Sequence, residues 1–302
     1  YKNMQWSKFL YNHNYSQPYI QRFFPIFFSP LLKKCQSIHH IYVNHADSVM
    51  VSESTIYRLV DYQLFEARNI DLPRKVRYAP RKKKKIFKVD KTCRLNRTYK
   101  DYLNFCKENP DVPVTQIDSV EGKKGGKVLL TIHFVKAECM LAFLRDANDS
   151  QSVIHIFNRL YLELSPDVYC GLFPLLLGDN GSEFSNPAAL ELDGQGNQRS
   201  HVFYCAPSSP EQKGSCERNH EFLRMFIPKG TSLDTFTQSD ISLMVDHINS
   251  YGRPGLGNKS PYEMMAFLYG EGLLKLLGCH QVCRDDVTLS PAIFKKGGET
   301  DA

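Results

Sequence analysis

The segment FPLLLGDNG at residues 173–181 is typical of a buried strand that stops at a glycine and an acid. In an open α/β sheet, ligands gather beyond the carboxyl ends of the strands. Asp179 directly follows such a strand end, which makes it a candidate functional group. Asp-Asn-Gly is also favourable turn chemistry, so this segment alone fits a plain turn equally well.

The segments around residues 173–181 complete an α/β pattern. Predicted strands are PVTQIDSVEG (113–122), KVLLTIHFV (127–135), ECMLAFLR (138–145) and HVFYCAP (201–207). Predicted helices are SVIHIFNRLYLEL (152–164), SPEQKGSCERNHEFLRMFI after its first turn (209–227) and DISLMVDHINSY (240–251). Three antiparallel strands, a helix, a parallel strand, another strand and more helices indicate an α/β sheet with helices on both faces, over residues 110–278.

Composition and charge narrow the class of protein. The 302 residues are roughly two domains, and 42% apolar with 23% charged residues excludes collagen-like, coiled-coil and wholly disordered chains. No window approaches 18 uninterrupted apolar residues, so no membrane span is expected. Nine cysteines without a framework favour reduced thiols in a cytoplasm. The chain begins at Tyr1 rather than Met, so we expect the native N-terminus to lie upstream.

The positive charge is concentrated in one segment. Residues 68–100 hold 14 Lys and Arg against two acids, a net +12, whereas the other residues hold 24 against 30, a net −6. Within the predicted basic linker (68–109), IDLPRKVRYAPRKKKK (70–85) contains two prolines and few aromatics, which favours phosphate contacts over base stacking. The candidate DNA contacts are Arg74, Lys75, Arg77, Arg81, Lys82, Lys83, Lys84 and Lys85. The alternative is a solvated spacer.

The segment before the linker has the outline of a helix-turn-helix over residues 31–67. Apolar residues recur at helical spacing across KKCQSIHHIYVNH (33–45), ADSVMVS (46–52) is a polar break, and STIYRLVDYQLF (54–65) predicts a second helix capped by Ser52 or Ser54. A second helix of this kind reads base edges with its first residues. These are Ser54, Thr55, Tyr57 and Arg58. An ordinary pair of packed helices is the alternative.

Three acids lie where the α/β pattern can bring acids together. Asp118 is in the first predicted strand, Asp179 follows the central strand, and Glu217 is on the helix after the last strand. Clustered carboxylates bind Mg²⁺ or Mn²⁺, and two such ions about 4 Å apart suit in-line displacement at phosphorus. Taken singly, the three acids also fit a hairpin cap, a turn residue and a solvated helix residue. Glu121 and Glu221 compete with Asp118 and Glu217, respectively.

The sequence segments around these acids closely resemble those of the acid-triad (DDE) transposases of the insertion-sequence-30 type. The matching segments are QIDSVEG (116–122), LLGDNGSEFSNP (176–187), APSSPEQKGSCERNHEFLRMFIPKGT (206–231) and INSYGRPGLGNKSPYEMM (248–265). The resemblance places the catalytic, metal-binding triad on Asp118, Asp179 and Glu217. Arg224, two helical turns after Glu217, matches a basic position of the family and is a candidate contact to a DNA phosphate.

The resemblance implies a ribonuclease H-like core preceded by a helix-turn-helix domain. It also implies Mg²⁺-dependent (or Mn²⁺-dependent) cleavage and strand transfer, with two ions and no covalent protein intermediate. The partners would be double-stranded DNA, as element terminal repeats and target, and a second copy of the chain, at the nucleoid in a bacterial cytoplasm. A nuclease or integrase of the same fold, and an inactive DNA-binding remnant or regulator, remain alternatives.

The ends of the chain add little to this interpretation. Residues 1–30 show no clean period and receive no structural assignment, and residues 1–28 match nothing in the family, whose first DNA-binding helices should lie upstream. Residues 279–302 are set apart as a tail. Cys279-His280-x-x-Cys283 has no second ligand pair at finger spacing, so zinc is not expected there.

Overall fold

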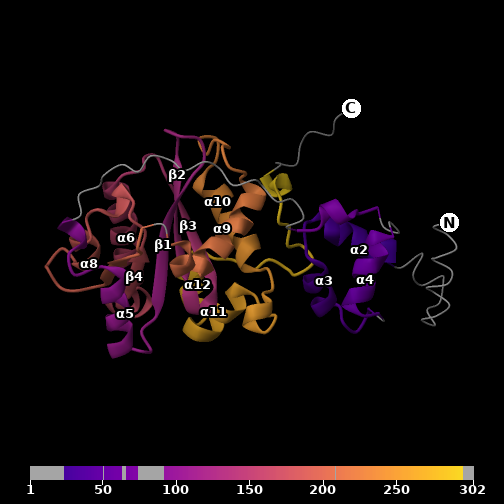
Figure 1. Ribbon diagram of the computed structural model, residues 1–302, viewed down its shortest axis with the longest axis horizontal. Coiled ribbons are helices and arrows are strands. Elements are labelled where there is room, and N and C mark those ends of the chain that lie inside the picture. The colour runs from indigo at the N-terminus through magenta and orange to yellow at the C-terminus, as the bar shows by residue number, and fades with distance from the viewer. Residues whose placement is uncertain (1–23, 50, 63–65, 74–91, 208, 295–302) are drawn as a thin grey trace. The chain divides into compact units, whose positions relative to one another are not determined.

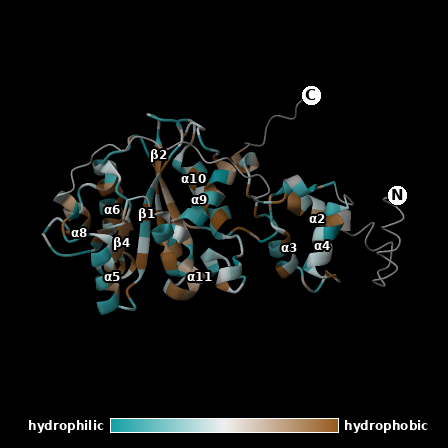
Figure 2. Ribbon diagram, in the orientation of Figure 1, coloured by the Kyte–Doolittle hydropathy of each residue, from teal (hydrophilic) through white to brown (hydrophobic). Residues whose placement is uncertain are grey.

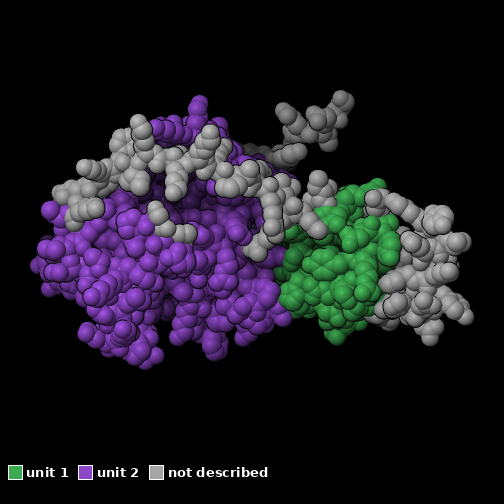
Figure 3. Space-filling model, in the orientation of Figure 1, with its two compact units in different colours: residues 1–82, 283–290 green, residues 83–282, 291–302 purple. Residues whose placement is uncertain are grey.

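The computed structural model describes residues 24–49, 51–62, 66–73, 92–207 and 209–294. The chain divides into two compact units, coloured in Figure 3. Unit 1 comprises residues 1–82 and 283–290, and unit 2 comprises residues 83–282 and 291–302. In the described ranges no helix combines the length and apolar character that crossing a membrane requires.

Unit 2 is built on one five-stranded mixed sheet. Its strands are β1 (Val114–Glu121), β2 (Val128–Phe134), β3 (Cys139–Arg145), β4 (Leu175–Gly178) and β5 (His201–Tyr204). The spatial order is β3-β2-β1-β4-β5. β1, β2 and β3 pair antiparallel, whereas β4 runs parallel to β1 and β5 parallel to β4. This is the ribonuclease H-like arrangement, and it confirms the predicted fold of the core.

Helices cover both faces of this sheet (Figure 1). They are α5 (Tyr99–Glu108), α6 (Ser150–Leu164), α7 (Pro166–Leu172), α8 (Ala188–Glu191), α9 (Gly214–Phe226), α10 (Gln238–Asn249), α11 (Pro261–Tyr269) and α12 (Glu271–Leu276). Successive residues of β4 show the two faces: Leu176 packs in the large cluster with α6 and α7, whereas Leu175 and Leu177 pack with α5. Because both faces are buried, β2 (VLLTIHF) and β4 (LLLG) read as largely apolar runs, whereas β1 (VTQIDSVE) also carries polar residues (Figure 2).

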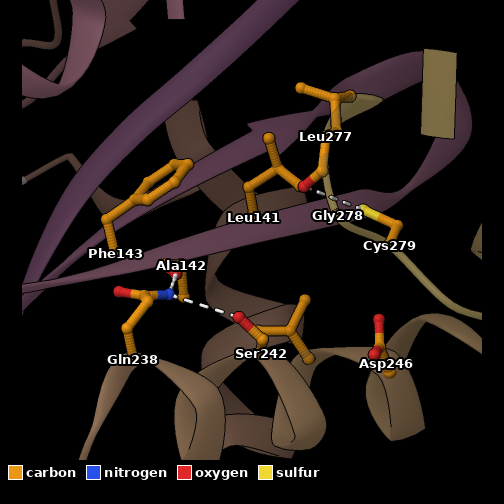
Figure 4. A pocket seen from close by; sticks show the side chains of 10 residues that line it. Leu141, Ala142, Phe143, Gln238, Ser242, Asp246, Leu277, Gly278 and Cys279 are labelled. Atoms are coloured by element: carbon orange, nitrogen blue, oxygen red, sulfur yellow. Dashed lines mark hydrogen bonds between the residues drawn. The ribbon is translucent and has the colours of Figure 1, made fainter. Parts of the chain in front are cut away.

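The edge strand β3 is covered by side chains of α10. Asn249 accepts from the backbone N–H of Met140 (3.0 Å) and donates to its carbonyl (2.8 Å). The Gln238 amide bonds the β3 backbone on either side of Phe143: it accepts from Leu144 N (2.8 Å) and donates to Ala142 O (2.9 Å, Figure 4). These amides satisfy an edge that would otherwise pair with other chains. The cavity of about 30 Å³ beside Gln238 holds at most one water.

The glycine at the end of β1 is required by a backbone contact. A Cβ on Gly122 would lie 2.2 Å from the carbonyl oxygen of Thr231, in the turn after α9. Gly122→Ala is therefore expected to lower the free energy of unfolding by about 2 kcal/mol, since backbone must move to relieve the clash. Gly171→Ala is the control, because nothing lies within 4 Å of its added Cβ and alanine favours helix. Equal denaturation midpoints for both variants would contradict this packing.

The described residues of unit 1 form three α-helices around an apolar core. They are α2 (Phe24–Lys33), α3 (Ile38–Asn44) and α4 (Glu53–Asp61). The continuous helix predicted over residues 33–45 is wrong: α2 ends at Lys33, Cys35 has a φ of 60°, and α3 begins at Ile38. The break arises because the Ser37 hydroxyl caps α3, accepting from His40 N at 3.1 Å. Ser52, rather than Ser54, is the N-cap of α4.

A C-terminal segment, residues 283–290, belongs to unit 1. The Gln36 amide donates to Val287 O (2.8 Å), Leu289 N donates to Lys34 O (2.9 Å), and His45 Nε2 lies 2.7 Å from an Asp285 carboxylate oxygen. Val287 and Leu289 are fully buried. Residues set apart from sequence as part of a tail therefore belong to the N-terminal helical unit, to which they are hydrogen-bonded.

Candidate active site

Two of the candidate acids are brought together by the parallel pairing of β1 and β4. The last paired residues are Gln116 and Leu177, and Asp118 and Asp179 each lie two residues further along their strands. The two carboxylates therefore leave the sheet at the same place. Burial and then the charge of Asp118 raise the pKa of Asp179, which shows that the two acids are electrostatically coupled.

Glu217 lies in the first turn of α9, a helix that packs on β1. Partial burial and then the charge of Asp118 raise the pKa of Glu217. Asp118 is thus the acid whose charge acts on both Asp179 and Glu217. We call these three residues, contributed by β1, the β4 end and α9, the carboxylate cluster.

The competing acids lie differently. Glu121 is exposed at the far end of β1, where its carboxylate accepts from the Asn148 amide at 3.3 Å. Glu221 is one helical turn beyond Glu217 and acts on it as a like charge. Among the acids near Asp179, Asp118 contributes most to the rise in the pKa of Asp179.

The Asp-Asn-Gly turn fixes Asp179 through local hydrogen bonds. Its carboxylate accepts from Gly181 N at 2.8 Å, and the Asn180 amide donates to Cys205 O at 2.6 Å. A Cβ on Gly181 would lie 2.3 Å from the carboxylate of the buried Glu183, so any side chain there would displace that carboxylate. Asp179 is therefore both a turn residue and a candidate functional group, so the turn interpretation of Asp-Asn-Gly does not exclude the functional one.

A buried lysine, which was not singled out from sequence, provides the counter-charge of the cluster. Lys213 ends the 3₁₀ turn Pro210–Lys213 just before α9. Its Nζ lies 3.0 Å from Asp118 Oδ2 and donates to Ile117 O at 3.0 Å. Burial opposes its charge, but Asp118 and Asp179 outweigh burial and raise the pKa of Lys213. The sequence contains one indication of this role: Lys213 is the basic residue four positions, about one helical turn, before Glu217.

Two further groups from α9 border Asp118. Cys216 and His220 are four residues apart and so lie on one helix face. His220 Nδ1 is 3.9 Å from Asp118 Oδ2, and its Nε2 is 2.9 Å from Thr131 Oγ1 and 3.5 Å from Cys216 Sγ. Burial lowers the pKa of His220 and raises that of Cys216 to about 12. Neither residue was singled out from sequence, although the Cys-x-x-x-His spacing marks them.

The candidate DNA contacts of α4 divide by exposure. Ser54, Tyr57 and Arg58 are exposed. Thr55 is buried and its hydroxyl bonds Ser52 Oγ at 2.9 Å, so it packs the helix start, and its part in base reading stays a prediction.

Arg224 is tied to backbone at the end of β1. Its guanidinium donates to Glu121 O (3.2 Å) and Ile227 O (3.4 Å), and the side chain is half-buried. Other candidate DNA contacts from the sequence lie outside the described residues: Arg74, Lys75, Arg77, Arg81, Lys82, Lys83, Lys84 and Lys85.

The chain matches no protein-family model. It does match curated transposases. The transposase of insertion element IS1086 from Cupriavidus metallidurans is 30% identical over 127 residues, which are 42% of this chain and 35% of the relative. Transposase InsI of IS30A from Escherichia coli is 28% identical over 148 residues, which are 49% of this chain and 36% of the relative. A probable transposase of IS1161 from Streptococcus salivarius is 28% identical over 233 residues, 75% of this chain and 62% of the relative.

The chain is similar to the transposases of IS30-type insertion sequences. It spans between 35% and 62% of the length of these relatives. A solved structure, the catalytic core domain of BIV integrase, aligns with 54% of this chain and 97% of its own, at 19% identity and a TM-score of 0.36. The similarity to IS30-type transposases agrees with the family resemblance found from the motifs.

Proposed function

We propose that this chain is a DNA transposase, which cuts DNA at the ends of an insertion element and joins those ends to target DNA. One observation carries the proposal: the parallel strands β1 and β4 lead to two acids at the same edge of the sheet, Asp118 and Asp179, and the charge of Asp118 also acts on Glu217, in a chain similar to insertion-sequence transposases. Such a cluster does not favour a protein that only binds DNA, because clustered carboxylates repel a phosphate backbone unless cations accompany them.

The donor set fits hard divalent cations. Asp118, Asp179 and Glu217 offer only carboxylate oxygens, which Mg²⁺ and Mn²⁺ prefer, and their mutual repulsion is relieved when such ions bind. Two ions bound there supply charge neutralisation at the attacking and leaving oxygens of a phosphodiester. We assign all three acids as ligands and as the catalytic triad.

The surrounding residues hold the triad in place. Lys213 bridges Asp118 Oδ2 and the Ile117 carbonyl, so it orients the Asp118 carboxylate while no cation is bound. Gly181 N orients the Asp179 carboxylate through its 2.8 Å hydrogen bond. Water and the freed 3′-hydroxyl are the successive nucleophiles in this scheme, so no Ser, Cys or Tyr of the chain forms a bond to DNA.

The proposed partners are duplex DNA, in the form of terminal repeats and target, and a second copy of the chain. Unit 1 is assigned to helix-turn-helix binding over residues 31–67, with Ser54, Tyr57 and Arg58 at the surface of α4. Residues 68–109 would connect it to the catalytic core at residues 110–278 and bind phosphates. Holding two element ends together requires a dimer.

A strand-transfer assay tests the function. The substrate is a pre-cut oligonucleotide that carries the inverted repeat flanking the coding sequence, with plasmid target and Mg²⁺. Joined products are expected. Cleavage without joining would favour a nuclease, and binding without cleavage would favour a regulator; either result contradicts the proposal.

The basic segment gives a separate prediction on DNA affinity. Replacing Arg81 and Lys82 through Lys85 by Ser should flatten the log–log dependence of DNA affinity on salt by about 0.9 for each DNA phosphate that the variant no longer neutralises. Fluorescence anisotropy over a range of salt concentrations measures this slope. An unchanged slope would mean that the segment is only a spacer.

A further inference from the structure

We propose that Asp118, Cys216 and His220 form a binding site for a thiophilic divalent cation such as Zn²⁺, which shares Asp118 with the carboxylate cluster. The ligand atoms of these three residues, a carboxylate oxygen, a thiol sulfur and an imidazole nitrogen, all lie within 4.8 Å of one another. Zinc takes such mixed ligands in a tetrahedron, and three protein ligands leave the fourth position open.

The site is built from rigid elements. Cys216 and His220 project from one face of α9, and Asp118 comes from β1, on which α9 packs. Cys216 is 1% exposed, whereas Asp118 and His220 have side chains 20% and 18% exposed. The sulfur therefore forms the floor of the site, and the oxygen and nitrogen lie at its mouth, where an ion can enter.

Hydrogen bonding leaves one imidazole nitrogen available. Thr131 Oγ1 donates to Asp118 O at 3.2 Å and lies 2.9 Å from His220 Nε2, from which it accepts in the tautomer that carries the ring proton on Nε2. With the proton on Nε2, the lone pair is on Nδ1, which faces Asp118 Oδ2 at 3.9 Å. A second ring nitrogen held by a hydrogen-bond partner is the usual arrangement for a metal-binding histidine.

The donor chemistry separates this site from the carboxylate cluster. Thiolate and imidazole select zinc and its neighbours in the transition series, whereas Mg²⁺ requires oxygen. On binding, Cys216 releases its thiol proton to water and a sulfur–metal bond forms. Lys213 Nζ already contacts Asp118 Oδ2 at 3.0 Å, so the incoming ion must displace this ammonium from the shared oxygen.

The functional consequence rests on the proposed transposase activity. An ion between Cys216 and His220 withdraws Asp118 from the carboxylate cluster, and Mg²⁺ then lacks the ligand whose charge acts on both Asp179 and Glu217. Zinc is thus expected to suppress strand transfer in the presence of Mg²⁺. This suppression should be weaker for Cys216→Ser than for the wild type, each measured against its own zinc-free rate.

Cobalt titration tests binding without any activity. Co²⁺ added to the metal-free, reduced full chain should give a thiolate-to-cobalt absorption band that saturates at one equivalent. Cys216→Ser should abolish the band and weaken binding about tenfold or more. The double variant Cys279→Ser/Cys283→Ser should keep the band, since these cysteines lie elsewhere. No band in the wild type, or a band that survives Cys216→Ser, would overturn the proposal.

X-ray absorption provides a measurement that does not depend on the folding of Cys216→Ser. Zinc bound to the Cys279→Ser/Cys283→Ser protein should show one sulfur neighbour at about 2.3 Å together with nitrogen or oxygen at about 2.0 Å. A shell of oxygen alone would refute the site. Because neither spectrum involves DNA, failure of the zinc site and failure of the transposase proposal are distinguishable.

Discussion

Asp179→Asn should reduce cleavage and strand transfer about a thousand-fold, a loss of about 4 kcal/mol of transition-state stabilisation. The amide keeps the shape of the carboxylate and its hydrogen bond from Gly181 N, but it lacks the charge that holds a divalent cation. The strand-transfer assay with Mg²⁺ measures the loss. DNA affinity should be retained, and Asp111→Asn, an exposed acid before β1, should remain active as the matched control.

The same substitution makes a prediction on stability. Burial and Asp118 raise the pKa of Asp179, so the folded chain binds a proton more readily than the unfolded chain. This group therefore destabilises the metal-free protein at neutral pH, and its penalty falls as pH drops through the raised pKa. Asp179→Asn should melt at a higher temperature than the wild type at pH 7, with the gap closing towards acid pH. A lower Tm at pH 7 would mean that Asp179 is a structural partner.

Lys213→Met should lower the free energy of unfolding of the metal-free protein by about 3 kcal/mol, as expected when one partner of a buried ion pair is removed. Lys213 is 6% exposed and its ammonium is the positive charge on Asp118 Oδ2. Mg²⁺ should restore part of the stability, because a bound cation replaces the missing charge. Urea denaturation with and without Mg²⁺ measures both effects.

Lys127→Met is the matched control for this experiment. Lys127 pairs with Asp146 at 3.9 Å, but the Asp146 side chain is 94% exposed, and such surface pairs contribute little. Lys127→Met should shift the free energy of unfolding by less than about 1 kcal/mol relative to the wild type, and Mg²⁺ should not change this shift. Equal destabilisation by the two substitutions would contradict the assignment of Lys213 as the counter-charge of the cluster.

Much of the core was predictable because its signals are local. Short strand-like segments ending in turn residues predicted β1 to β5, and the parallel pairing of β1 with β4 explains why Asp118 and Asp179 leave the sheet at the same place. The groups that were not singled out from sequence are defined by tertiary contacts instead. Lys213, just before α9, and Cys216 and His220, on α9, acquire their importance only because this segment packs on β1 beside Asp118.

Unit 1 shows the opposite case, in which one residue changes the local structure. Leu32, Ile38 and Ile41 keep helical spacing across residues 33–45, and this periodicity predicted one helix. The Ser37 cap divides that segment while all three apolar residues still reach the same core. The place of residues 283–290 in unit 1 was not predictable, since it depends on hydrogen bonds to residues about 250 positions earlier.

Anomalous diffraction from crystals of the protein soaked in Mn²⁺ tests the central claim most directly. We expect Mn²⁺ within about 2.1 Å of carboxylate oxygens of Asp118 and Asp179, with Glu217 completing the site. The Lys213 ammonium should be displaced from Asp118 Oδ2. Manganese bound elsewhere, or a saturating soak that leaves the Lys213–Asp118 ion pair intact and no peak at the three acids, would contradict the claim.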